Sequence, residues 1–260
     1  MDNQIIEKLT ENEREFLYGL ERGIQEENIY RMEEWATFFA FVHPELVTKD
    51  IAEKIVYCYE QASAGGISRA TLNLGAIYYN GVIVDRDFKK AFGLYQKAAK
   101  SEDREVAARA ISNLGYCYFY GRDIPLDYEK AFHHFLAGAL RFEDSNCLYK
   151  LGDMYRYGNY VPADEKMAFL LYQKAYQETH TGEDCYADVI KRLGDCALNG
   201  IGTKKDPILA IHYLTTAQGY LYEKIYQKRD PYAKTVLTDV ERLIECAKAE
   251  LIMDSNPEGL

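Results

Sequence analysis

The side chains best suited to chemistry in this sequence are five histidines, and their spacing gives little support to a metal or catalytic site. They are His43, His133, His134, His180 and His212. No histidine is followed by a histidine or cysteine four residues later, and no Cys-x-x-Cys pair is present, as common zinc sites would require. Neither Gly-x-Ser-x-Gly nor Ser-x-x-Lys, the motifs of serine-based hydrolysis, occurs. The sequence therefore predicts a protein that is not an enzyme and that has no catalytic residues and no metal.

One segment superficially resembles a phosphate-binding loop. Gly200-Ile201-Gly202-Thr203-Lys204-Lys205 combines glycines with lysines, but the Walker spacing is absent. No strand is expected before it, so the strand–loop–helix context of such a loop is missing as well. We therefore expect no cofactor.

Charge and cysteine usage narrow the class of protein further. The net charge of −10 argues against nucleic acid as a partner, because phosphate binding needs clustered Lys and Arg. The six cysteines follow no common repeating pair and are expected to be reduced, apolar core residues. Asp2 stands where a signal peptide carries positive charge, and the densest apolar stretch, Trp35–Val42, is too short to span a bilayer. A cytoplasmic protein without a membrane span is the expectation.

The elements that carry these residues are organised by a Leu-Gly pair that occurs four times, at Leu74-Gly75, Leu114-Gly115, Leu151-Gly152 and Leu193-Gly194. Successive copies begin 40, 37 and 42 residues apart. In every copy a second glycine follows the leucine by seven residues, an aspartate by thirteen and an alanine by seventeen. Such self-similarity at a nearly constant interval is the signature of a repeat protein.

Each copy predicts two antiparallel helices. Apolar residues at helical spacing flank the leucine and form one stripe. The adjacent glycine costs roughly 1 kcal/mol of helix propensity relative to alanine, so its recurrence predicts close approach of the second helix at matching small residues. Those small residues are Ala98, Gly138, Ala175 and Ala217. The later glycine is typical of a helix C-terminus, and the aspartate is expected to cap the second helix.

The pattern L-G-x-x-Y-x-x-G, a short loop, D-x-x-x-A and an aromatic four residues later resembles the Sel-one-like repeat (SLR) family, a relative of the tetratricopeptide repeat. The resemblance covers residues 66–219. Two features depart from the family pattern. Only Gly202 keeps the second loop glycine, which is replaced by Ile83, Asp123 and Tyr160 in the other copies, and Ala197 replaces the tyrosine in the fourth copy.

The resemblance implies an all-α, right-handed α-solenoid of antiparallel helix pairs, similar to a tetratricopeptide superhelix. We expect residues 1–47 to form an N-terminal helical cap of two helices and residues 48–65 a degenerate half-repeat. Four repeats then occupy residues 66–222, and residues 223–260 form a C-terminal capping helix. Caps are needed because a terminal repeat would otherwise expose an apolar face.

The resemblance also implies a partner-binding surface, because the first helices of tetratricopeptide-like arrays line the concave face. Tyrosine and arginine, which are enriched at interface hot spots, occupy many of the corresponding positions. The candidate partner-binding residues are Tyr79, Arg109, Tyr116, Phe119, Tyr120, Tyr149, Arg156 and Tyr157. The alternative for these rings is simple packing between neighbouring helices.

The function that follows is a non-catalytic scaffold or adaptor that binds a peptide or partner protein in the concave groove. One alternative is a hydrolase of the type proposed for secreted, cysteine-rich relatives. Another is a structural or regulatory subunit that docks by its convex face. On that face Lys89, Lys130 and Lys166 are expected to form an ordinary solvated surface.

Overall fold

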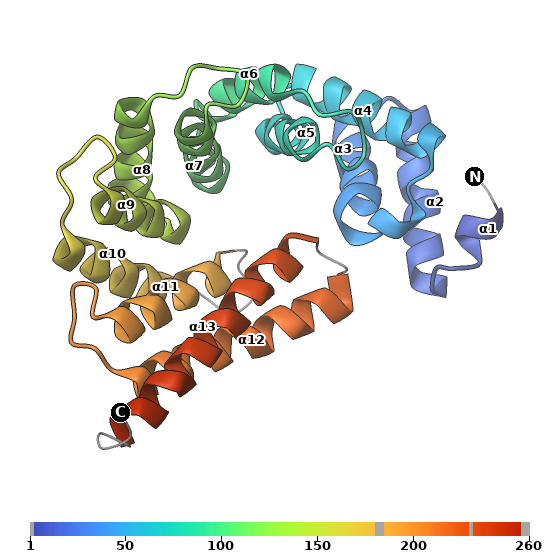
Figure 1. Cartoon of the computed structure of the whole chain (residues 1–260). Helices are drawn as coiled ribbons and strands as arrows, with labels where there is room; N and C mark the ends of the chain where they lie inside the picture. The colour runs from blue at the N-terminus through green and yellow to red at the C-terminus, as the bar shows by residue number, and fades with distance from the viewer. Residues whose placement is uncertain (1–2, 180–184, 229–230, 256–260) are drawn as a thin grey trace. The chain divides into compact units, whose positions relative to one another are not determined.

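The computed structural model describes residues 3–179, 185–228 and 231–255, and every regular element in that part of the chain is helical (Figure 1). The chain divides into two compact units, Met1–Asp127 and Tyr128–Leu260. The first unit contains α1 (Asn3–Ile6), α2 (Glu11–Gln25), α3 (Ile29–Thr37), η1 (Phe38–Val42), η2 (Pro44–Leu46), α4 (Lys49–Ala64), α5 (Ser68–Asn80), α6 (Phe88–Ala98) and α7 (Arg104–Tyr120). The second contains α8 (Tyr128–Phe142), α9 (Ser145–Tyr157), α10 (Glu165–Glu178), α11 (Tyr186–Asn199), α12 (Pro207–Lys228) and α13 (Pro231–Ser255).

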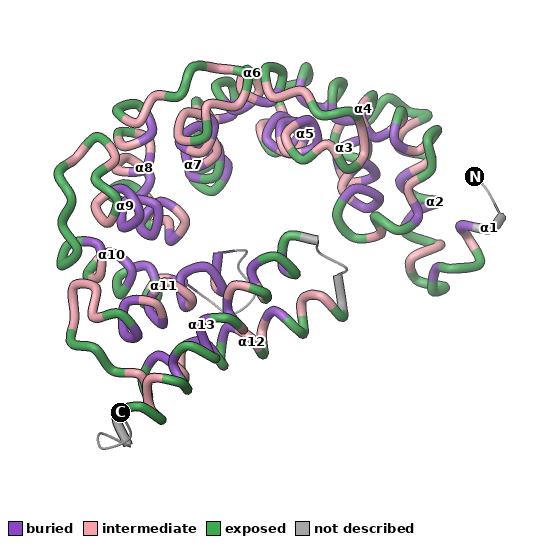
Figure 2. The backbone as a smooth tube through the Cα atoms, viewed as in Figure 1, coloured by how far each residue is buried: buried purple, intermediate pink, exposed green. Residues whose placement is uncertain are grey.

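Each helix packs on the next one along the chain, from α2 to α7 in the first unit and from α8 to α13 in the second. Figure 2 shows the consequence, with buried residues concentrated where neighbouring helices of a unit face one another. Such nearest-neighbour packing is how repeat proteins bury their apolar surface. The predicted all-α helical-repeat solenoid is therefore confirmed.

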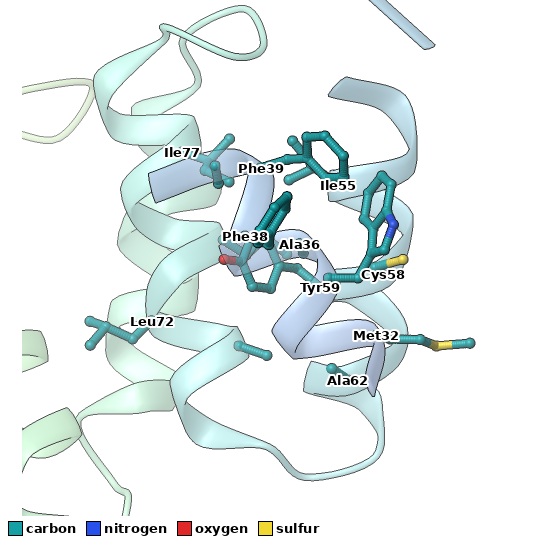
Figure 3. Close-up of a cluster of buried hydrophobic side chains, with 14 of the residues drawn as sticks. Met32, Ala36, Phe38, Phe39, Ile55, Cys58, Tyr59, Ala62, Leu72 and Ile77 are labelled. Atoms are coloured by element: carbon teal, nitrogen blue, oxygen red, sulfur yellow. The ribbon is translucent and has the colours of Figure 1, made fainter. Parts of the chain in front are cut away.

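The N-terminal cap, for which the sequence pattern predicts two helices, contains further helical elements. Besides α2 and α3 there is the short α1, and α3 continues into a π-helical turn, η1, before the chain turns at Pro44. Phe38 and Phe39, at the start of that turn, join Tyr59 of α4 and Ile77 of α5 in one buried cluster (Figure 3). The N-terminal segment thus shares its core with the first repeat.

The helix-ending glycines behave as the spacing predicts. Gly81, Gly121, Gly158 and Gly200 all adopt left-handed backbone conformations, with φ between 61° and 71°. The N–H of each donates to the carbonyl of the residue four positions earlier, which is the geometry of a glycine helix cap. A side chain with a Cβ is disfavoured at such φ values, which explains why glycine recurs there.

The aspartate thirteen residues after each leucine closes the loop at both of its ends. The side chains of Asp87, Asp164 and Asp206 accept hydrogen bonds from the backbone N–H three residues later, at 2.8–2.9 Å, and so cap α6, α10 and α12. Their own N–H groups, and that of Asp127, donate to the carbonyl nine residues earlier in the preceding helix. The loop is therefore tied to both helices by one residue.

The sequence predicts that the glycine beside each leucine faces a small residue of the second helix. The structure corrects this, because the glycine leaves room for a ring or a branched side chain. A Cβ on Gly75 would lie 2.7 Å from Cε1 of Tyr95, and one on Gly152 would lie 2.5 Å from Cε1 of Tyr172. At Gly194 the residue in the way is Leu214, with its Cγ at 2.7 Å. The second helix does approach closely, but the contact is made by the large residue eight positions after the capping aspartate. The small residues Ala98, Ala175 and Ala217 are buried, but they do not occupy the space beside the glycine.

The loop position at which the chain departs from the family pattern has consequences for backbone strain. Asp123, Tyr160 and Gly202 occupy it with φ of 54°, 71° and 66°, whereas Ile83 does not have a positive φ. A β-branched residue is strongly disfavoured in the left-handed region, so the first loop takes another path. At Gly202 there is a second constraint, because a Cβ would lie 2.1 Å from the carbonyl oxygen of Glu165.

Candidate functional site

Arg122, in the loop after α7, lies at the centre of a cluster of rings in the first unit. Its guanidinium carbon is 4.9 Å from the ring centroids of both Tyr79 and Tyr120, and 5.3 Å from that of Phe88. A cation within about 6 Å of an aromatic centroid is attracted by the negative face of the ring. The rings of Tyr79 and Phe88 also meet edge to face, with centroids 5.3 Å apart. We call these four residues the Arg122 cluster.

The helix ends position this cluster. Tyr79 and Tyr120 are in the last turns of α5 and α7, and Gly81 and Gly121 end those helices in the same way. Arg122 directly follows Gly121, and Phe88 is the first residue of α6. Sequence reasoning included Tyr79 and Tyr120 but missed Arg122, because it considered only positions within the helix. The sequence signal for Arg122 was its place directly after the helix-ending glycine, which itself follows Phe119 and Tyr120.

Tyr116 and Phe119 extend the cluster along α7. The rings of Tyr116 and Tyr120 are nearly parallel, with an interplanar angle of 7° and centroids 6.2 Å apart, and Phe119 meets Tyr120 edge to face at 5.1 Å. Tyr120 is 46% exposed, while Tyr116 and Phe119 are half-buried. Of the predicted residues, Tyr79 and Tyr120 contact Arg122, and Tyr116 and Phe119 contact Tyr120.

Burial disfavours the ionised form of Tyr79. Burial raises the pKa of Tyr79 to about 12, and the positive charge of Arg122 opposes that rise. Like an unperturbed tyrosine, Tyr79 is neutral at physiological pH, and its hydroxyl can donate a hydrogen bond. Arg109, also predicted for this surface, is exposed on α7 and forms a long ion pair of 4.0 Å with Glu105. Exposed pairs of this kind contribute about 0–1 kcal/mol, so Arg109 is free to reorient.

The predicted residues of the second unit have different environments. Arg156 of α9 forms a 2.7 Å ion pair with Asp195 of α11, and its guanidinium carbon lies 5.2 Å from the ring centroid of Tyr157. Tyr157 is 64% exposed. Tyr149 is instead buried, and the guanidinium of Arg192 lies 4.6 Å from its ring centroid. The position of Tyr149 is thus a packing position, contrary to the expectation that its ring lies open in a groove.

A buried ionic network beside Tyr149 was not foreseen. Asp153 of α9 receives two hydrogen bonds from Arg192 of α11, at 2.5 and 2.8 Å, and one from Lys150 at 3.0 Å. The hydroxyl of Tyr172 donates a further one at 2.9 Å. Arg192 also contacts Asp188, which is buried one turn earlier on α11. Two cations and two carboxylates therefore compensate each other inside the unit.

This network shifts the pKa values of its members. Burial would raise the pKa of Asp153, but the charges and hydrogen bonds of Arg192 and Lys150 outweigh it and lower that pKa to about 2. Burial and the nearby carboxylate both raise the pKa of Tyr172. Because every charge has a partner, the arrangement serves to hold α9, α10 and α11 together.

The described residues contain no group of three or more His, Cys, Asp or Glu residues placed to hold a metal ion. None of their helices combines the length and the apolar character that crossing a bilayer demands. All six cysteines are unpaired and Cys246 alone is exposed, and burial raises the pKa of Cys58, Cys117 and Cys196 to about 12. Thiols with such pKa values are poor nucleophiles.

Comparison with known proteins identifies the repeats. The family model of the Sel1 repeat matches residues 68–103, 108–141, 145–180 and 188–217, which together make up just over half of the chain. The chain belongs to the Sel1 repeat family. Its Sel1 repeats coincide with the helix pairs α5–α6, α7–α8, α9–α10 and α11–α12. Proteins built from Sel1 repeats are generally non-catalytic scaffolds for protein–protein interaction.

Solved structures with the same fold are also known. A Sel1 repeat protein from Oxalobacter formigenes matches with a TM-score of 0.60 and 16% sequence identity, over 89% of this chain and 96% of that one. A protective antigen of uropathogenic Escherichia coli strains, with an SLR fold, matches with a TM-score of 0.53 and 18% identity. That match covers 90% of this chain but only 54% of the antigen. No curated protein sequence matched the chain.

Proposed function

We propose that this Sel1 repeat protein is a non-catalytic scaffold that binds a peptide or partner protein through the first helices of its repeats. The observation that carries the proposal is the Arg122 cluster, in which one guanidinium contacts rings at the ends of α5 and α7 and at the start of α6. Arginine and tyrosine dominate interface hot spots because they bury much area and keep a polar end. A cation and rings that are already in contact lose little entropy when a partner binds.

The Arg122 cluster suits an extended or helical peptide with its own polar groups. Arg122 offers guanidinium N–H donors, and the hydroxyl of Tyr79 adds another donor beside them. The exposed ring of Tyr120 supplies apolar area beside them. In the second unit, Tyr157 offers a similar exposed ring next to Arg156, although Asp195 already neutralises that arginine. We therefore expect the binding energy to concentrate in the first unit.

The test begins with co-purification from the native cell and mass spectrometry, using the wild type, a Tyr120→Ala/Arg122→Ala variant and a Tyr18→Ala control. Tyr18 on α2 is 52% exposed, close to the 46% of Tyr120, so the control removes a comparable ring elsewhere. Partners recovered with the wild type and the control should then be measured for affinity. The double variant should bind at least about tenfold more weakly, equivalent to roughly 1.4 kcal/mol, with unchanged circular dichroism and melting.

Two results would contradict the proposal. Equal affinity in the double variant and the wild type would leave the Arg122 cluster as a packing feature. Loss of binding in the Tyr18→Ala control as well would place the interaction on the N-terminal helices. An Arg156→Ala variant changes the second unit alone, so its affinity should stay at the wild-type value if the binding energy is concentrated in the first unit.

A further inference from the structure

A hollow on the surface of the first unit lies between α4, α5 and α6 and shares no residue with the Arg122 cluster. Its volume is about 380 Å³, within the range of about 300–1,000 Å³ that is typical of ligand pockets. Three helices line it, each with residues at helical spacing along one face. They are Glu60, Ser63 and Ala64 of α4, Leu74 and Tyr78 of α5, and Lys90, Gly93, Leu94 and Lys97 of α6. Leu74 and Tyr78 are buried and form an apolar floor.

Gly93 is the residue that opens this hollow. A Cβ built on it would meet no atom of the described residues within 4 Å beyond its own helix. Glycine is the second-worst residue for a helix interior, so its presence in the middle of α6 has a conformational cost. The same position, six residues after the capping aspartate, holds His133, Leu170 and His212 in the other three repeats. The first repeat alone therefore lacks a large side chain at this point.

The rim of the hollow on the α6 side is basic. The charged residues that α6 contributes to the lining are Lys90 and Lys97, and α6 has no acidic residue although the whole chain has a net charge of −10. The ammonium of Lys97 is fixed by hydrogen bonds to the carbonyl and hydroxyl oxygens of Ser63, at 2.9 and 3.1 Å. That of Lys90 lies 4.8 Å from the ring centroid of Tyr78 and 4.0 Å from Asp87. Lys90 is thus held at the edge of the apolar floor with most of its charge open to solvent.

We propose that this hollow is a docking site for an acidic amphipathic helix of a partner protein. One apolar side chain of that helix enters the space above Gly93 and rests on Leu74 and Tyr78. A carboxylate one turn away faces Lys90 and the α6 wall, and the helix keeps its acidic side away from Glu60 on the α4 wall. The apolar floor provides the burial and the lysines select for negative charge, the division of labour found in helix-in-groove recognition.

The proposal can be tested with a synthetic probe and matched variants. The probe is a fluorescent, alanine-based helical peptide with one central leucine flanked by glutamates at i−4 and i+4, and its binding is followed by fluorescence anisotropy. Gly93→Leu fills the hollow with the side chain that the third repeat carries at this position. Gly19→Leu on α2 is the matched control, since Gly19 is also a helical glycine whose Cβ would meet no described atom within 4 Å.

A second pair of variants tests charge. Lys90→Glu reverses a lining charge, and Lys89→Glu makes the same change to an exposed lysine that does not line the hollow. We expect Gly93→Leu and Lys90→Glu each to weaken binding at least tenfold and both controls to leave it within twofold. A peptide with lysine in place of glutamate should bind at least tenfold more weakly than the probe.

Three results would overturn the inference. The first is binding of the acidic peptide to Gly93→Leu with wild-type affinity. The second is equal binding of the acidic and basic peptides. The third is no binding to the wild type at peptide concentrations of about 1 mM, which corresponds to less than about 4 kcal/mol of binding free energy. A Tyr120→Ala/Arg122→Ala variant should bind the probe normally, so failure here and failure of the Arg122 cluster are distinguishable.

Discussion

Alanine at Gly152 should destabilise the protein, whereas the same substitution at Gly93 should stabilise it. Both glycines lie inside helices, where alanine is ordinarily more favourable by about 1 kcal/mol. At Gly93 the added methyl group is unobstructed and the gain is realised in full. At Gly152 the Cβ would lie 2.5 Å from Cε1 and 2.7 Å from Cδ1 of Tyr172, far inside van der Waals contact. The same substitution is therefore expected to change the free energy of unfolding in opposite directions at the two sites.

The magnitude at Gly152 follows from what holds the Tyr172 ring in place. The ring is fully buried, and its hydroxyl donates a 2.9 Å hydrogen bond to Asp153. Overpacking of a tight site costs about 1–3 kcal/mol. A hydrogen bond to a charged group contributes about 1.5–3 kcal/mol, part of which is lost if the ring moves. After subtraction of the helix-propensity gain, the net destabilisation should be roughly 1–4 kcal/mol.

Urea unfolding followed by far-UV circular dichroism measures both variants, and Trp35, the single tryptophan, reports separately on the first unit. Repeating Gly152→Ala in a Tyr172→Phe background tests the mechanism, because the hydroxyl anchor is then absent and the substitution should cost less. Equal stability of Gly152→Ala and Gly93→Ala would show that the contact between Gly152 and Tyr172 does not limit the size of the side chain there. An equal cost in both backgrounds would reject the role of the Asp153 anchor.

Three further outcomes are expected. Because the folded-state pKa of Asp153, about 2, is below its ordinary 3.8, its charge should contribute about 2 kcal/mol of stability above pH 4. That contribution is lost as pH falls from about 4 towards 2, and Asp153→Asn should flatten the pH dependence of unfolding in that window. Under native conditions a thiol reagent should modify Cys246 rapidly and the five buried cysteines only on unfolding, and more than one rapidly reacting thiol would contradict the burial pattern. Gly202→Ala should lower the melting temperature, since its φ is 66° and its Cβ would lie 2.1 Å from the carbonyl oxygen of Glu165; an unchanged transition would show that the loop can move away.

The repeat itself was predictable from sequence because local rules govern it. A glycine with a left-handed backbone conformation and an aspartate that caps a helix can be recognised in the sequence by residue type and by constant spacing. The helix pairs therefore follow from the Leu-Gly frame without knowledge of tertiary contacts. The repeat pattern did not predict that Tyr95 packs against Gly75 and Tyr172 against Gly152. These contacts depend on the rotation of one helix about its axis relative to the next.

The candidate site was predictable only in part, for the same reason. Tyr79, Tyr116 and Tyr120 could be assigned to one face by their offset from the leucine, but Arg122 lies outside the helical register. Tyr149 has the offset of an exposed ring, yet Arg192 of the next repeat covers it. The angle between neighbouring repeats decides whether Arg192 reaches Asp153 or solvent, and no single-repeat pattern encodes that angle.

The ion pairs of the last two repeats limit how this chain can be rebuilt by gene duplication or by an engineer. Arg192 on α11 neutralises Asp153 on α9, and Lys191 on α11 bonds Asp239 on α13 at 2.7 Å. A repeat inserted between α10 and α11 would separate Asp153 from Arg192 and leave a buried carboxylate without its main partner, at a cost of about 3–5 kcal/mol. The segment from α9 to α13 is therefore a cassette that can be copied, transplanted or removed only in one piece.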